Sequence, residues 1–147
     1  MTNWIIRRAK LPEAEILASC IDSAYSVYAG RDIDLPAVSD GIAEDIQSNL
    51  VWVAVVGQQI VGVLVFIPRE DHAILSNLAV DPSATGSGLG RALLDRAELE
   101  ARSLGLDRLK LPTHVGIPEN MRLYEHLGWR ESGRIGSKVH MEKLIAS

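Results

Sequence analysis

The chain has 147 residues, of which 47% are hydrophobic and 23% are charged, proportions typical of an ordinary globular protein and not of a disordered or fibrous one. Its formal net charge of -4 argues against nucleic-acid binding, which requires a basic face. The length fits a single domain, residues 1–147, and since no apolar run reaches the length of a membrane span and no cleavage signal is present, we expect a cytoplasmic protein without membrane attachment.

The N-terminal part of the chain predicts a strand followed by a helix. Residues 3–8 form a short, partly apolar run. Pro12 then opens a helix that runs toward Tyr25 or Tyr28, because proline fits the first turn, where a backbone N–H has no partner within the helix. Cys20 is the single cysteine of the sequence, which excludes an internal disulfide bond, and we expect it to be a small buried apolar residue.

The middle of the chain predicts a helix and three strands. Residues 39–49 carry apolar side chains four positions apart, as on one face of a helix. The segment 50–68 contains two β-branched runs separated by Gly57 and Gln58, which predicts a hairpin with glycine at the first turn position. Residues 72–80, HAILSNLAV, supply the next strand.

A strand end, a glycine-rich turn and a helix follow one another in LAVDPSATGSGLGRALL, residues 78–94. We expect the helix from about Gly88 to Leu104, and Gly105 fits the glycine that commonly ends a helix. Residues 106–111 alternate apolar and basic side chains, which predicts a strand with one buried face. Because one helix connects the two strands, we expect them to pair in parallel through a right-handed crossover.

The C-terminal part of the chain predicts a helix and two strands. Pro118 opens the helix, which ends at Gly128, and the segments 129–134 and 138–144 form the strand pair. The predicted order is therefore β-α-α-β-β-β-α-β-α-β-β, an α/β fold with a mixed sheet.

The glycine turn TGSGLG admits several interpretations. A P-loop requires lysine and then serine or threonine after its last glycine, but Arg91 and Ala92 follow Gly90. A dinucleotide-binding GxGxxG motif does not match the spacing of Gly86, Gly88 and Gly90. Two interpretations remain open: backbone amides at the start of the helix bind a phosphate group, or the glycines serve only the packing of a tight turn.

Together with the order of elements, this strand, turn and helix resemble the acyl-CoA site of the GNAT superfamily of acetyl-CoA-dependent N-acetyltransferases, and the resemblance covers nearly the whole chain. The segment ENMRLYEHLGWRESG resembles the later helix and strand of these proteins, with Tyr124 at their tyrosine position, and VHMEKLI resembles their common ending. The hairpin and the segment PREDHAILSNLAV resemble a largely uncharacterised bacterial branch. The resemblance implies a central, mostly antiparallel sheet in which one parallel pair of strands splays apart.

The resemblance also implies acetyl-CoA as the co-substrate, with no metal. The backbone around Leu78, Ala79 and Val80 is expected to pair with the pantetheine arm, while Asn120 and Tyr124 contact the cofactor from the later helix. The residues expected to hold the pyrophosphate are Thr85, Gly86, Ser87, Gly88, Leu89, Gly90 and Arg91. At Thr85 the family usually has arginine or glutamine, so this sequence lacks one long polar side chain in the pyrophosphate region.

Three residues are expected to carry the chemistry that the resemblance implies. Tyr124 would be the acid that protonates the departing thiolate, although a tyrosine that only caps a backbone group is the alternative. Ser76 stands near the position where members of this branch often carry an acidic base, and serine is a poor base. His114, or else His72, would then substitute as base because histidine titrates near neutral pH, although either would also fit an exposed surface residue. Residues that would line an acceptor pocket are Tyr25, Tyr28 and Trp52, although Trp52 would fit the core instead.

The sequence therefore leaves two classes of function. The first is an N-acetyltransferase that moves acetyl from acetyl-CoA to a primary amine of a small molecule, peptide or protein by direct attack. The second is a GNAT-like module that binds acyl-CoA with little or no catalysis, which the departures at Ser76 and Thr85 favour. The sheet edges and the strand expected over 138–144 would also allow a homodimer.

Overall fold

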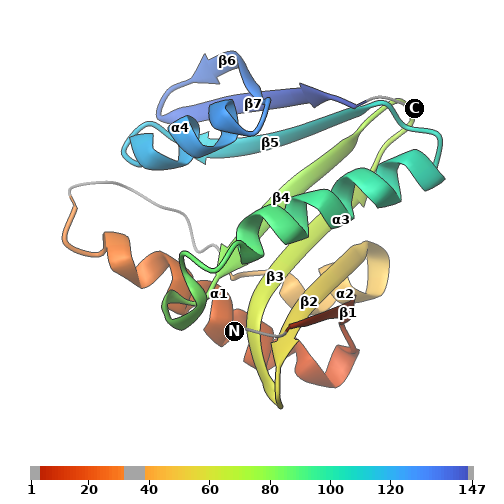
Figure 1. Ribbon diagram of the computed structural model, residues 1–147, viewed down its shortest axis with the longest axis vertical. Coiled ribbons are helices and arrows are strands. Elements are labelled where there is room, and N and C mark those ends of the chain that lie inside the picture. Colours follow the sequence, from red (N-terminus) through yellow and green to blue (C-terminus); the bar gives the residue numbers. More distant parts are fainter. Residues whose placement is uncertain (1–3, 32–38, 146–147) are drawn as a thin grey trace.

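The computed structural model describes residues 4–31 and 39–145, which form a seven-stranded sheet with helices on both faces (Figure 1). The strands are β1 (Ile5–Arg8), β2 (Leu50–Val56), β3 (Gln59–Pro68), β4 (Ala73–Val80), β5 (Arg108–His114), β6 (Arg130–Ile135) and β7 (Lys138–Leu144). The α-helices are α1 (Ala14–Tyr25), α2 (Ile42–Ser48), α3 (Leu89–Ser103) and α4 (Pro118–His126). Short 3-10 helices are η1 (Leu11–Glu13), η2 (Ser26–Tyr28) and η3 (Pro82–Ala84). Within these ranges no helix combines the length and the hydrophobicity needed to cross a bilayer.

The order of these elements confirms the predicted β-α-α-β-β-β-α-β-α-β-β sequence, and the strands lie in the order β1-β2-β3-β4-β5-β7-β6. All neighbouring strands pair antiparallel except β4 and β5, which pair in parallel as expected. The predicted hairpin joins β2 to β3, and Gly57 has the positive φ of 62° that a glycine-first turn requires. Residue 3, which the sequence assigned to the first strand, lies outside the described residues.

Some boundaries differ from the predictions for identifiable reasons. The helix predicted over 39–49 is shorter, because Gly41 adopts a left-handed φ of 82° immediately before α2. The strand predicted after α3 begins later, because the Leu106 N–H still donates to the Ala101 carbonyl at 2.8 Å as part of the helix cap. That strand also runs on to His114, because β7 continues to pair with it.

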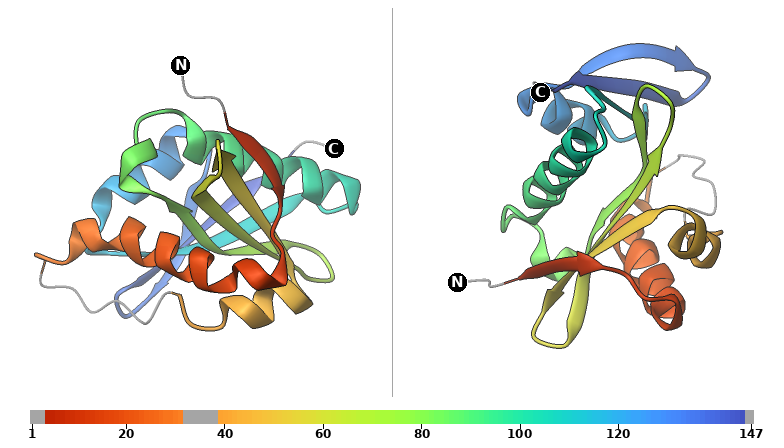
Figure 2. Two further views of the ribbon diagram at one scale, coloured as in Figure 1. Left: turned by 90° about the horizontal axis from the view of Figure 1, so that it is seen from below. Right: turned by 90° about the vertical axis from the view of Figure 1, so that its right-hand side faces the viewer.

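Two hydrophobic cores lie on the two faces of the sheet, with α3 and α4 on one face and α1 and α2 on the other (Figure 2). The buried stripe of α3 has helical spacing and consists of Leu89, Leu93, Leu94, Ala97 and Ala101. On the opposite face α1 buries Leu17, Cys20 and Ile21. Cys20 is thus a buried apolar residue, as expected, and burial raises the pKa of its thiol to about 11.

The sheet opens between its two parallel strands. The pairing of β4 with β5 is confined to Ala73 with Leu109 and Ile74 with Lys110, whereas β5 pairs with β7 along its whole length. Beyond those pairs the two strands diverge, and Figure 1 shows β4 and β5 converging near the C-terminal end of the chain and separating toward α1 and α4. The expected splayed pair is therefore present.

Pro112 explains why the pairing of β4 with β5 does not continue. The Ile145 N–H donates to the Asp107 carbonyl, and the Val115 N–H donates to the Ser137 carbonyl, both at 2.9 Å. Because backbone groups alternate in direction along a strand, odd-numbered residues of β5 face β7 and even-numbered ones face β4. Pro112 therefore removes a donor on the side that faces β4, where a continued ladder would need it.

The two faces of α3 predict different effects of the same substitution. Leu93 is 0% exposed, and Leu93→Ala is expected to lower the free energy of unfolding by about 2–5 kcal/mol because it leaves a cavity in the core. Leu99 is 55% exposed on the same helix, and Leu99→Ala should change it by less than about 0.5 kcal/mol. Urea denaturation of both variants measures the difference, and equal losses would contradict the assigned buried face.

Candidate functional site

Two neighbouring cavities lie along the diverging strands. One, of about 260 Å³, is bounded by β4, β5 and the start of β7, and we call it the reaction cavity. The other, of about 290 Å³, lies between β4, the end of α1 and the glycine turn, and we call it the turn cavity. Both are lined by Tyr25, Leu78, Asn120 and Tyr124. Because the same side chains bound both cavities, together they form a trough from the start of α3 to the end of β5.

The turn cavity brings together most of the residues that the sequence assigned to a cofactor. Its lining includes Leu78, Ala79, Val80, Thr85, Gly86, Gly88, Leu89, Gly90, Asn120 and Tyr124. Ser87 and Arg91 do not line it. The Ser87 hydroxyl donates to the Ala84 carbonyl at 2.5 Å, and the Arg91 side chain lies at a separate small cavity beside Asp95 and Trp129.

The glycines of the turn are needed for two different reasons. Gly88 precedes α3 with a left-handed φ of 86°, a conformation that other residues rarely adopt. Gly90 has no positive φ, and a Cβ added there would meet nothing nearer than the Val80 Cγ2 atom at 3.9 Å. Helix stability alone would favour alanine over glycine at position 90. The space that Gly90 leaves belongs to the turn cavity, so this glycine fits the close approach of a ligand rather than the packing of the chain.

The edge of β4 presents unpaired backbone groups to the trough. The Asp81 N–H donates to the Val61 carbonyl at 2.8 Å, which sets the alternation of directions along β4. Ala79 therefore directs its peptide groups at β3, whereas those of Leu78 and Val80 face the gap. Since β5 has already separated from β4 at this level, Leu78 and Val80 form an open strand edge inside the sheet.

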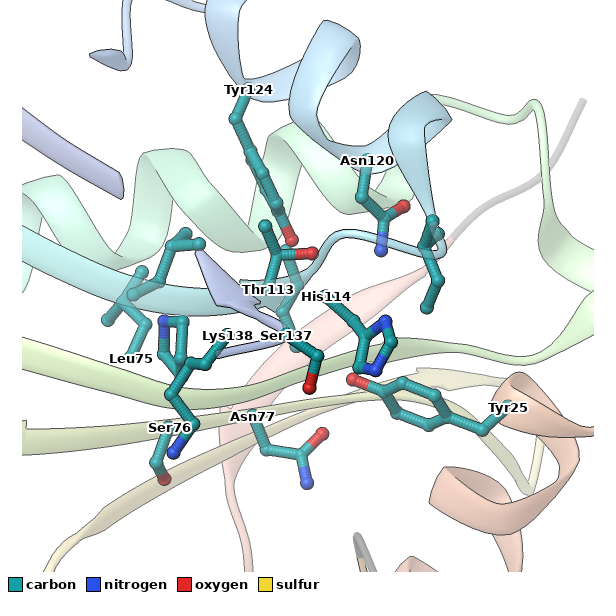
Figure 3. Close-up of a pocket in the computed structure, with 14 residues that line it drawn as sticks. Tyr25, Leu75, Ser76, Asn77, Thr113, His114, Asn120, Tyr124, Ser137 and Lys138 are labelled. Atoms are coloured by element: carbon teal, nitrogen blue, oxygen red, sulfur yellow. The ribbon is translucent and has the colours of Figure 1, made fainter. Parts of the chain in front are cut away.

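The reaction cavity begins at a β-bulge in β4. Val65 pairs with Asn77 and the next residue, Phe66, pairs with Leu75, so Ser76 is an extra residue on β4. Ser76 is exposed at the rim of the cavity, and Figure 3 shows it on the side opposite Tyr25. The bulge turns the chain at the point where the trough widens.

Tyr124 stands at the junction of the two cavities. Its side chain is buried, and its ring packs against Trp129 with a centroid separation of 5.9 Å. Figure 3 shows the hydroxyl directed into the reaction cavity beside Thr113. Burial raises the pKa of Tyr124 well above its ordinary value, and the nearby Tyr25 and Tyr28 raise it further. The phenol therefore remains protonated throughout the physiological pH range.

His114 lines the reaction cavity as a hydrogen-bond donor. The Gly116 N–H donates to His114 Nδ1 at 2.8 Å, so Nδ1 must be the unprotonated nitrogen of the neutral ring. The ring proton is therefore on Nε2, which is buried and has no hydrogen-bond partner among the described residues. This geometry does not suit the base that the sequence indicated, because Nδ1 already accepts a hydrogen bond from Gly116 and Nε2, which carries the ring proton, is buried.

Two other predicted residues lie outside the trough. His72 precedes the closed end of the gap, where its Nδ1 lies 2.6 Å from the Asp71 carboxylate, and it does not line the reaction cavity. Trp52 packs between two arginines, with Arg96 4.3 Å and Arg8 5.5 Å from its ring centroid. Tyr25 and Tyr28, by contrast, do line the trough as expected.

A contact across the trough was not predicted from the sequence. Arg31 forms an ion pair with Glu119 and donates to the Gly116 carbonyl at 3.0 Å, which joins the end of η2 to the start of α4. Its guanidinium also lies 4.9 Å from the Tyr28 ring centroid. The residues are 85 or more positions apart in the chain, so no local pattern could have indicated this contact.

The ion pair between Arg31 and Glu119 predicts a lowered pKa for Glu119. Arg31 lowers the pKa of Glu119 to about 2 through a hydrogen bond and its charge, so the pair persists above the ordinary glutamate pKa and is lost only as pH falls toward 2. In Arg31→Ala the Glu119 pKa should return toward 4.5, as measured by carboxyl NMR titration. Glu131, whose pKa Arg134 lowers, is the internal control and should not move.

Comparisons with known proteins agree on the fold. The family model of the acetyltransferase (GNAT) domain matches residues 47–131, which is more than half of the chain. The structure resembles that of PaiA N-acetyltransferase from Thermoplasma acidophilum in complex with coenzyme A, with a TM-score of 0.87 and 20% identity over 97% of this chain and 99% of that one. This likeness extends over nearly the whole of both chains.

Curated relatives match shorter segments. A mycothiol acetyltransferase from Beutenbergia cavernae is 48% identical over 52 residues, which is 35% of this chain and 18% of that protein. An IAA acetyltransferase from Azospirillum brasilense is 39% identical over 75 residues, which is 51% of this chain and 49% of that protein. The chain thus spans less than half the length of these relatives, and their names mention different compounds.

Proposed function

The chain belongs to the GNAT acetyltransferase family, and we propose that it transfers an acetyl group from acetyl-CoA to a primary amine. The observation that carries this proposal is the trough, in which the glycine turn at the start of α3 leads along an open strand edge to a buried tyrosine. Such an order of groups suits a long ligand with a phosphate end and a reactive thioester end.

The turn cavity would hold the phosphate end. Backbone N–H groups in the first turn of α3 lack helical partners and carry the positive end of the helix dipole, so they attract a pyrophosphate. Gly90 lets the phosphates approach the main chain closely. With Thr85 in place of a longer polar side chain and the Arg91 side chain directed elsewhere, binding relies on these amides.

The open edge of β4 would pair with the pantetheine arm as a further strand would. Leu78 and Val80 offer their N–H and carbonyl groups to the gap, and the arm carries amides that can pair with them. Leu78 lines both cavities, so its N–H is suited to stabilise the negative charge that develops on the thioester oxygen.

Tyr124 would donate a proton to the departing sulfur. Acetyl-CoA supplies the activated acetyl group, and the amine nitrogen forms a bond to its carbonyl carbon as the carbon–sulfur bond breaks. The ordinary pKa of a thiol, about 8.5, lies below that of a phenol, so the transfer needs a directed hydrogen bond. Burial raises the pKa of Tyr124 as well as that of a thiol in the same cavity, so the difference remains and the transfer depends on that hydrogen bond.

The described residues that line the reaction cavity supply no side-chain carboxylate as base. We therefore expect the amine to react in its neutral form and to release its proton to water after it attacks the thioester. The same observation favours a second candidate function, a module that binds acyl-CoA with little catalysis, since Ser76 and His114 Nε2–H do not accept a proton readily. Binding and turnover experiments separate the two.

Cofactor binding is tested at Gly90. A ligand raises the melting temperature only if it binds the native state. Acetyl-CoA should therefore raise the melting temperature of the protein, whereas ATP and NAD, whose binding motifs the turn does not match, should not. Gly90→Ala should keep or slightly raise the melting temperature without ligand and weaken acetyl-CoA affinity by about tenfold or more. The control is Gly133→Ala, at a position with open space and no positive φ, which should leave affinity unchanged. Unaltered affinity in Gly90→Ala would contradict the proposed phosphate site.

Turnover is tested at Tyr124. Tyr124→Phe keeps the ring packed against Trp129 but removes the acid, so kcat for thiol release should fall by about 100-fold or more. Coenzyme A affinity, measured by calorimetry, should stay within about threefold. A variant as active as the parent would reject the acid role, and a parent that binds acetyl-CoA without acetylating any amine would identify the module.

A further inference from the structure

Each of the polar side chains that line the reaction cavity can donate a hydrogen bond. Among the described lining residues the charged side chain is that of Lys138, and the other polar groups are hydroxyls, amides and the His114 ring. Lys138 has no ion-pair partner within the described part of the chain. Its positive charge is therefore available to a ligand.

Lys138 and His114 are brought together by the pairing of β5 with β7. They are directly opposed in the register of the two strands, so their side chains project from the same face of the sheet. Figure 3 shows the Lys138 side chain extending toward Ser76 and the His114 ring facing Tyr25, on two sides of the cavity. Four methylene groups let the ammonium reach across that space.

His114 contributes a donor whose direction is set by its own backbone. Because Gly116 N–H occupies Nδ1, the ring proton lies on Nε2, which is buried in the wall of the cavity without a partner among the described residues, and Figure 3 shows the ring beside Tyr25. A buried donor without an acceptor costs free energy, and a ligand that supplies an acceptor removes that cost. The most favourable acceptor for a lysine charge and a neutral N–H together is an anionic oxygen.

Resting on the function proposed above, we propose that the acceptor is an amino acid, whose carboxylate binds at Lys138 and His114 while its amine attacks the thioester. Lys138 supplies the charge, and His114 Nε2–H supplies a directional hydrogen bond to a carboxylate oxygen. A polyamine would place a second positive charge near Lys138, which like-charge repulsion disfavours. An amino-acid amide, which has a neutral carboxamide in place of the carboxylate, would lack the ion pair with Lys138.

The test compares free acids with their amides. Alanine, leucine and glutamate are each offered as the amino acid and as the α-carboxamide to the full chain with saturating acetyl-CoA, and kcat/KM is measured from thiol release. The acid-to-amide ratio in the parent is divided by the ratio in Lys138→Gln, so the different amine reactivities cancel. We expect a quotient of about ten to a hundred, the range of a hydrogen bond to a charged group.

Two variants serve as controls. Lys138→Arg keeps the charge and should retain most of the preference for the acid. Arg130→Gln removes an exposed positive charge from β6, outside the cavity, and should leave the ratio unchanged. A quotient near one for Lys138→Gln, or an equal loss in Arg130→Gln, would overturn the inference while leaving the acetyltransferase proposal intact.

A binding measurement covers the case in which no acceptor of the panel is acetylated. N-acetylleucine and N-acetylleucinamide are titrated into the coenzyme A complex, with the His114 Nε2–H resonance as the reporter. Tighter binding of the acid, lost in Lys138→Gln, would support the inference, and equal binding of both compounds would overturn it. Failure of coenzyme A itself to bind would instead refute the proposed function and with it this inference.

Discussion

The separation of β4 from β5 is the feature on which the rest of the molecule depends. Backbone N–H and carbonyl groups need partners, and an unpaired strand edge in the interior of a sheet is unfavourable unless something pairs with it. Here Pro112 removes a donor from the β5 side, while Leu78 and Val80 keep theirs on the β4 side. One hydrogen bond of a continued ladder between β4 and β5 is thus absent, and the edge of β4 remains open to an extended ligand.

Packing on both faces keeps this gap open. The core under α3 and the core under α1 hold β4 from its two sides, and the Arg31–Glu119 ion pair joins the elements that flank the mouth. Tyr124 connects the core to the trough, because its ring packs in the core against Trp129 and its hydroxyl reaches the trough. The position of the acid that we propose is thus set by the same contacts that stabilise the fold.

The two ends of the trough are formed by different kinds of chemical group. The turn end consists mainly of main-chain groups and glycines, which suit the phosphate that we propose for it. The reaction end uses side chains from α1, β5 and the start of β7, among them Tyr25, His114 and Lys138. Curated relatives of this chain are acetyltransferases whose names differ in the compound they mention.

Local signals in the sequence predicted the helices and strands, because hydrophobic period and the positions of proline and glycine each act within one element. The roles expected of the TGSGLG turn and of Tyr124 came from their resemblance to the GNAT acyl-CoA site. The assembly of the reaction end depends instead on contacts between elements that are distant in the chain. His114 faces Lys138 because β7 lies between β5 and β6, and the His114 ring is a donor because a backbone N–H two residues later occupies its other nitrogen. Contacts of this kind depend on strand register and on loop geometry. Both are determined by interactions between residues that are distant in the chain and meet only when the sheet forms.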